Sequence, residues 1–92
     1  MRLTIIPSDN AVYVDGNSKL NLDLTSCIIP NNIRALQWYE TKGWFEFTDD
    51  GDPFTPLAPN EIIDQLPQWA LDCYQVWVDT PAVQLSNWGV KP

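Results

Sequence analysis

The chain has 92 residues, which is the size of one domain with a modest core. Twelve acidic residues against five basic ones give a net charge of −7. This charge repels nucleic acid and anionic membrane surfaces, and it suits either a basic partner surface or simple solubility. Histidine is absent, which removes the commonest general base and the commonest transition-metal ligand.

The first third of the chain predicts short antiparallel strands. Residues 3–6 form a β-rich run that ends at Pro7, and residues 11–14 form a second run. The Asp-Gly pair in residues 15–18 favours a tight hairpin turn. Residues 19–24 then alternate between apolar and polar side chains, which predicts a half-buried strand. Three leucines would share its buried face: Leu20, Leu22 and Leu24.

Residues 33–47 predict the hairpin around which the domain is organised. Two apolar and aromatic runs flank a short polar turn in this segment. Leu36 and Trp38 share one side of the first arm, and Phe45 and Phe47 share one side of the second. Because aromatic side chains bury large areas, this hairpin is expected to supply the main wall of the core.

The C-terminal half predicts a stiff connector followed by a helix. Residues 53–59 contain two overlapping PxxP patterns, which favour polyproline II, either as a linker across the surface or as a ligand for an aromatic groove. Residues 60–66 suit one helical turn or an extended arm. From Pro67 to Asp79 apolar residues recur at helical spacing, which predicts an amphipathic helix that packs on the sheet.

The fold class expected from these elements is α+β. About five antiparallel strands would form a small meander or an SH3-like partly open barrel, with the helix against one face. Residues 1–80 would make a single domain and residues 81–92 a C-terminal tail. Cys27 and Cys73 form no CxxC pattern, so we expect two reduced, buried thiols and no zinc site.

Four aromatic residues are the candidates for binding a protein partner. Trp44 and Tyr39 lie on the sides of the hairpin arms opposite to the expected core. Phe54 lies between the prolines of the connector, and Trp88 lies in a tail without periodicity. Trp is enriched among binding hot spots. The alternative for Trp88 is that the tail folds back and this ring stacks on Trp44 within one chain.

The sequence offers little for catalysis or for cofactors. Without histidine no nucleophilic triad is evident, and no phosphate-binding loop is present. Glu40 and Glu46 flank the hairpin turn, where carboxylates are usually plain surface. The acidic turn at residues 48–53 lacks the spacing of a calcium loop. We therefore expect a protein that is not an enzyme, with no metal and no cofactor.

Several blocks of this chain resemble small proteins encoded near the tail and tail-fibre genes of tailed bacteriophages, cyanophages among them. The blocks read LTIIPSDNAVYVDG, LDL, ALQWY, GWFEF and LPQWA, and they span residues 3–78 in the same order. Some of these relatives carry the module ahead of a longer helical region typical of tail-fibre assembly proteins, and this sequence shows no such region.

The resemblance implies a virion structural protein in the tail, baseplate or fibre attachment. It would be made in the host cytoplasm and would bind other phage structural proteins or copies of itself, with no nucleic acid and no membrane as partner. The alternative is a binding protein outside the virion, either a fibre-assembly chaperone or an adaptor directed at a host protein. The resemblance supplies no catalytic residues.

Overall fold

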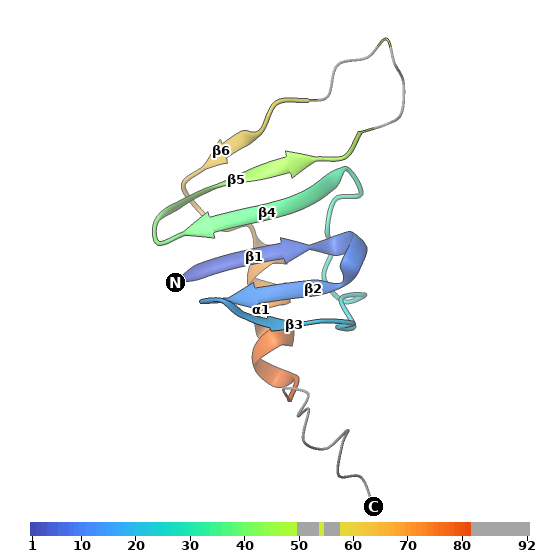
Figure 1. Ribbon diagram of the computed structural model, residues 1–92, viewed down its shortest axis with the longest axis vertical. Helices are drawn as coiled ribbons and strands as arrows, with labels where there is room; N and C mark the ends of the chain where they lie inside the picture. Colours follow the sequence, from blue (N-terminus) through green and yellow to red (C-terminus); the bar gives the residue numbers. More distant parts are fainter. Residues whose placement is uncertain (50–53, 55–57, 82–92) are drawn as a thin grey trace, which may run out of the picture.

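The computed structural model describes residues 1–49, 54 and 58–81 and contains one antiparallel sheet with one helix on it (Figure 1). The strands are β1 (Arg2–Ile6), β2 (Ala11–Val14), β3 (Asn17–Lys19), β4 (Ile33–Tyr39), β5 (Lys42–Phe47) and β6 (Glu61–Ile63). A 3₁₀ turn, η1 (Pro7–Asp9), joins β1 to β2, and the α-helix α1 (Gln68–Asp79) follows β6. The α+β prediction is confirmed.

The sheet consists of two meanders that are joined in the middle. Its order is β3-β2-β1-β4-β5-β6, so each half is built from strands that are consecutive in sequence. The halves meet where β1 pairs with β4, with Leu3 opposite Trp38 and Ile5 opposite Leu36. The sheet has six strands where about five were expected, and β3 and β6 end it on either side. It is therefore an open meander and not the partly closed barrel that was the other expectation.

The prediction of a strand over residues 19–24 is wrong. β3 ends at Lys19, and Asn21 has φ of 56°, in the left-handed region that interrupts an extended run. Leu20 consequently points to solvent, with 55% of its surface exposed. Leu22 and Leu24 are still buried, because the loop that holds them folds over the end of the sheet.

Residues 60–66 take the extended form of their two predicted alternatives. β6 adds to β5 with Trp44 opposite Ile62 and Gly43 opposite Ile63. The strand is only three residues long and lies at the edge of the sheet. From there the chain turns back, so that α1 covers the face that carries the core side chains (Figure 1).

The core lies between α1 and one face of the sheet, as the hairpin alternation predicted. Ala70 and Cys73 are the fully buried residues of the helix, and Trp69 packs on Phe45 with ring centroids 5.8 Å apart. The sheet contributes alternate residues from its central strands. These are Leu3, Ile5, Val12, Val14, Leu36 and Trp38.

Lys19 ties the C-terminal end of α1 to the edge of the sheet. Its Nζ donates hydrogen bonds to the backbone carbonyls of Trp77, at 2.6 Å, and of Thr80. The same ammonium lies 4.2 Å from the centroid of the Trp77 ring, and the indole N–H of Trp77 donates to the carbonyl of Asn17. A cation at this position satisfies carbonyls that the helix leaves unpaired and complements its dipole.

The two cysteines are free thiols, and both are buried in the core. The fold brings them close enough for Cys27 to act on the pKa of the Cys73 thiol. Burial raises the pKa of the Cys73 thiol well above its ordinary value, and the Cys27 contact and the charge of Asp72 act in the same direction. The thiolate form is therefore strongly disfavoured in the folded protein.

This raised pKa predicts both slow alkylation and a loss of stability at alkaline pH. At neutral pH we expect iodoacetamide to leave the folded chain unmodified and to add to both thiols once the chain is denatured. Because the folded state holds the Cys73 proton more tightly than the unfolded state, its contribution is present below about pH 8.5 and is lost at higher pH. The melting temperature should fall more steeply above that pH in the wild type than in Cys73→Ala. Parallel pH profiles of the two proteins would contradict this.

Candidate functional site

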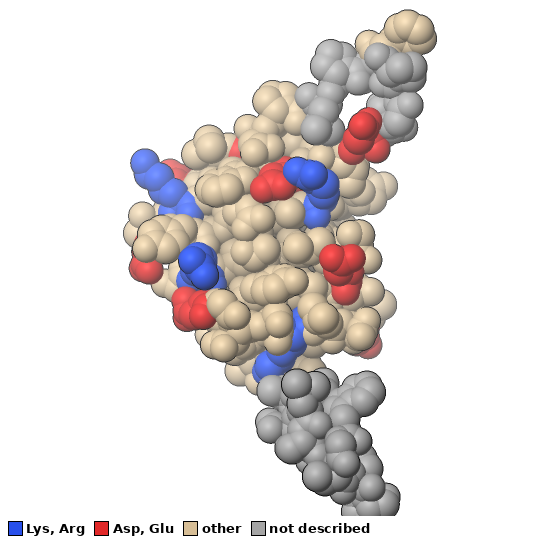
Figure 2. Space-filling view, viewed as in Figure 1, with Lys and Arg blue, Asp and Glu red and all other residues tan. Residues whose placement is uncertain are grey.

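The face of the sheet opposite α1 carries no covering element in the part of the chain that the structure describes (Figure 1). We call it the open face. Figure 2 shows this face, with charged side chains arranged around a centre of uncharged residues. Arg2 on β1 and Lys42 on β5 both stand opposite Tyr39 on β4, and Arg34 on β4 pairs with Glu46 on β5. Acidic side chains are also present on this face (Figure 2).

A row of four directly paired residues crosses the open face. Thr4 on β1 stands opposite Tyr13 on β2 and opposite Gln37 on β4, and Gln37 in turn stands opposite Trp44 on β5. The Thr4 hydroxyl donates a 2.8 Å hydrogen bond to Oε1 of Gln37. The row therefore has an aromatic ring at each end and a hydrogen-bonded polar pair at its middle, and the side-chain NH₂ of Gln37 is left available.

A second row lies two residues along the strands and carries positive charge. Arg2 stands opposite Tyr39, which stands opposite Lys42. Nη2 of Arg2 lies 3.8 Å from where a Cβ on Gly16 would be, so the guanidinium occupies space over this turn glycine. Among the described residues the Arg2 guanidinium makes neither a hydrogen bond nor an ion pair. The nearby carboxylate of Asp15 accepts from the backbone N–H of Arg2 at 2.8 Å.

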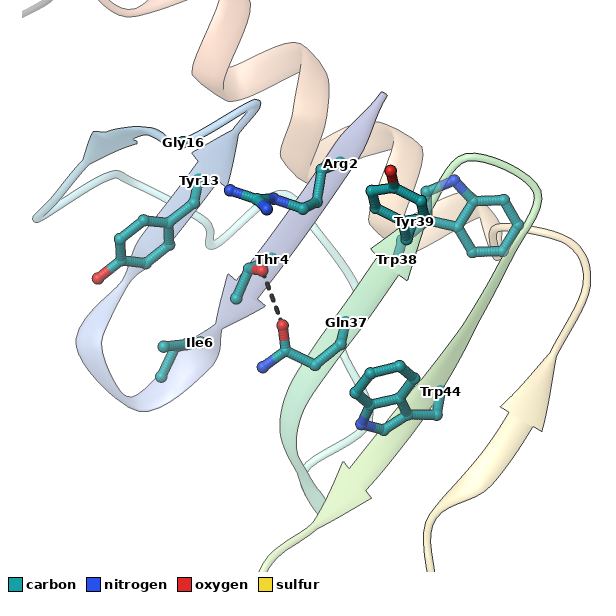
Figure 3. A pocket seen from close by; sticks show the side chains of 9 residues that line it. All are labelled: Arg2, Thr4, Ile6, Tyr13, Gly16, Gln37, Trp38, Tyr39 and Trp44. Carbon is teal, nitrogen blue, oxygen red and sulfur yellow. Dashed lines mark hydrogen bonds between the residues drawn. The ribbon is translucent and has the colours of Figure 1, made fainter.

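An open pocket of about 650 Å³ lies over these two rows, and every row residue except Lys42 lines it (Figure 3). This is within the range of pockets that hold small ligands or side chains of a partner. Its lining residues come from β1, β2, β4, β5 and the β2–β3 turn. They are Arg2, Thr4, Ile6, Tyr13, Gly16, Gln37, Trp38, Tyr39 and Trp44. Trp38 is the exception in the set, because it is largely buried in the core cluster on the helix side.

The indole of Trp44 is held in place by its neighbours. Its Nε1 donates to Oε2 of Glu46 at 2.9 Å, and Oε1 of Glu46 accepts from Arg34 at 2.7 Å. Both carboxylate oxygens are thus engaged, and the ring remains 37% exposed. An exposed aromatic ring that is already positioned loses little conformational freedom when a partner covers it.

The sequence prediction of binding residues finds two of the residues at this pocket. Tyr39 and Trp44 line it, as the alternation in the hairpin predicted, and Tyr39 is 62% exposed. Phe54 is exposed but does not line the pocket. Trp88 lies outside the described residues, as do the rest of residues 82–92 and, in the connector, residues 53 and 55–57.

Seven of the nine lining residues were missed at the sequence level, and among them are the polar and aromatic side chains of Arg2, Thr4, Tyr13 and Gln37. The signal was present in part, because these side chains alternate with core residues along their strands. What could not be read locally is that β1 pairs with β4, which is the contact that places Thr4 beside Gln37.

The two glutamates of the hairpin form ion pairs within the chain. Glu40 pairs with the N-terminal ammonium of Met1 at 3.2 Å, and Glu46 holds Arg34 and Trp44. Within the described residues no three metal-ligating side chains come together. No helix in the same part of the chain has both the length and the apolar character needed to cross a bilayer. Among the described residues, the side chains of Arg2 and Lys42 are the basic groups on this face without an ion pair.

Comparison of the chain with protein-family models, with curated proteins and with solved structures finds no match.

Proposed function

We propose that this chain is a binding protein without catalytic activity that docks a partner protein on the open face, as a structural component of a phage tail, baseplate or fibre attachment. The observation that supports the docking site is the pocket at the centre of this face, with Tyr39 and Trp44 exposed beside an unpaired Arg2. Tyr, Trp and Arg are the residue types most enriched among binding hot spots.

The contrast between the two faces of the sheet also supports this proposal. The helix side buries its apolar residues within the chain, whereas the open face presents aromatic rings to solvent. Placing such rings at the centre of a face, with charged groups around them, resembles the core and rim of a protein interface. Ile62 on β6 extends the exposed apolar surface next to Trp44, since the two residues are directly paired and Ile62 is 71% exposed.

The phage setting rests on the resemblance of the sequence blocks to proteins encoded near tail genes. Two roles are consistent with a docking face of this kind. The first, which we favour, is a permanent part of the particle. The second is a protein that acts outside the mature virion, as a fibre-assembly chaperone or as an adaptor on a host protein. Mass spectrometry of purified particles, compared with lysate of infected cells, separates these two roles by whether the chain is retained.

Truncation of Trp44 is the direct test of the docking face. We expect Trp44→Ala to lower affinity for the partner by about 2–4 kcal/mol, as is typical of a central hot-spot tryptophan. Because the ring lies on the open face and not in the core, the melting temperature should change little. The measurement is the amount of the variant recovered in purified particles of the phage that encodes it, together with its thermal unfolding.

Leu71→Ala is the matched control, because Leu71 is 44% exposed but belongs to α1 on the other side of the sheet. It should be recovered in particles like the wild type. If Trp44→Ala is recovered as well as Leu71→Ala, the open face is not the docking surface.

A further inference from the structure

We propose that the pocket on the open face takes an extended, proline-rich segment of the partner that carries one carboxylate side chain near its middle. This inference rests on the proposed function, because it specifies the chemistry of the partner at the same face.

The groups that remain available in the pocket are mainly hydrogen-bond donors. The guanidinium of Arg2 has five N–H groups and no partner among the described residues. The amide of Gln37 uses its oxygen for Thr4, which leaves its NH₂ group. The carboxylates near the pocket already have partners. Glu46 accepts from Arg34 and from Trp44, and Asp15 accepts from the backbone N–H of Arg2. A ligand rich in acceptors and poor in donors complements such a site.

A proline-rich segment has this character. Proline has no backbone N–H, and polyproline II leaves its carbonyl oxygens free because it forms no internal hydrogen bonds. Its rings pack on aromatic side chains, and Tyr13, Tyr39 and Trp44 supply such side chains here. The segment is also extended before it binds, so that little entropy is lost on docking.

The charge of the pocket selects for a carboxylate. An arginine binds a carboxylate through two parallel hydrogen bonds, which is the strongest polar contact that this pocket offers. Arg2 lies in the second row, beside the polar middle of the first row and between the aromatic ends. An Asp or Glu side chain near the middle of the bound segment would therefore reach it.

The length of the aromatic row fits about five residues. Tyr13 lies on β2 and Trp44 on β5, three strand spacings apart, which is about 14 Å. Five residues of polyproline II extend over about 15 Å. The segment would thus lie across the strands, with an apolar residue on the ring at each end.

The strand pairing argues against the other common mode of peptide binding, which is addition of a strand to a sheet edge. All four strands under the pocket, β2, β1, β4 and β5, have a hydrogen-bonded neighbour on both sides. Their main-chain groups are therefore used within the sheet, and the ligand must be recognised by side chains.

The test uses two synthetic peptides and the full chain. The first peptide is Ala-Pro-Pro-Glu-Pro-Pro-Ala with blocked ends, and the second has Gln in place of Glu. We expect calorimetric titration to show binding of the Glu peptide and about tenfold or greater weakening for the Gln peptide, because a charged hydrogen bond is lost. In Arg2→Gln the two peptides should bind equally weakly, and Tyr39→Ala should weaken both. Lys42→Gln, which changes a basic residue outside the pocket lining, should retain the preference for Glu.

Several outcomes would overturn the inference. Equal binding of the two peptides to the wild type would remove the role of the carboxylate. Binding of an acidic polysaccharide that depends on Arg2, without binding of either peptide, would assign the pocket to a sugar. Sedimentation that shows a dimer which the Glu peptide does not dissociate, and which Trp44→Ala abolishes, would assign the face to a second copy.

Failure of this inference is distinguishable from failure of the proposed function. If neither peptide binds but Trp44→Ala is still lost from particles, the docking face stands and the proposed chemistry of the partner is wrong. If Trp44→Ala is incorporated normally, the proposed function itself is wrong.

Discussion

Replacing Gly43 with alanine is expected to destabilise the domain by about 3 kcal/mol or more. A Cβ at this position on β5 would overlap the carbonyl oxygen of Gln37 and would lie 2.9 Å from both Cα and Cε3 of Trp38. The first two of these atoms are backbone of the neighbouring central strand, so the contact cannot be relieved by a rotamer change alone. For a domain of this size the melting temperature should fall by about 12–24 °C.

Thr41→Ala is the control for Gly43→Ala, because Thr41 is exposed in the turn of the same hairpin. Its melting temperature should remain within a few degrees of the wild type. Thermal unfolding followed by circular dichroism provides the measurement. A Gly43→Ala protein as stable as Thr41→Ala would show that β4 and β5 separate more easily at this point than their close packing indicates.

Leu36→Ala is expected to cost about 2–5 kcal/mol of stability. Leu36 is completely buried in the strand at the centre of the sheet and belongs to the main core cluster. Truncating it removes apolar contacts and leaves a cavity that two paired neighbours, β1 and β5, hold open. Chemical denaturation at equilibrium measures the loss as a lower midpoint with an unchanged slope.

Leu20→Ala makes the same chemical change at a leucine that is 55% exposed, and it should cost much less than 1 kcal/mol. Similar losses in the two variants would contradict the placement of Leu36 in the core. Gly43→Ala and Leu36→Ala also serve as references in the binding experiments, because they show how far recovery of the chain in particles falls when the fold itself is lost. A variant on the open face is informative only if its unfolding resembles that of Leu20→Ala.

Much of the fold was predictable because its elements carry local patterns. The hairpin of β4 and β5 and the helix α1 each repeat their own period over enough residues to be recognised. The prediction failed at residues 19–24, where alternation alone indicated a strand. The left-handed backbone of Asn21 interrupts it, and the leucines that follow are buried from a loop instead. The edge strand β6 was ambiguous because three residues carry too little pattern.

The candidate site was predictable only on the side of the hairpin. Alternation places Tyr39 and Trp44 away from the core without any knowledge of the rest of the sheet. Arg2 and Thr4 enter the site only because β1 pairs with β4, and this contact joins segments that are more than thirty residues apart. No local pattern encodes that pairing. The network that holds the Trp44 indole likewise depends on the register between Arg34 and Glu46.

The site also straddles the line along which the two meanders meet. Arg2, Thr4 and Tyr13 come from the first meander, and Gln37, Tyr39 and Trp44 come from the second. A ligand that contacts both meanders therefore binds only when they are joined. Its binding free energy must then stabilise the joined sheet over the separated meanders. Substitutions that loosen the pairing of β1 with β4 would weaken binding without touching the pocket. Closing that junction is also one of the long-range steps of folding, together with the docking of α1 on β1 and β2. A bound partner would thus hold β1 and β4 together, and the site would be occupied only in molecules in which these two strands are paired.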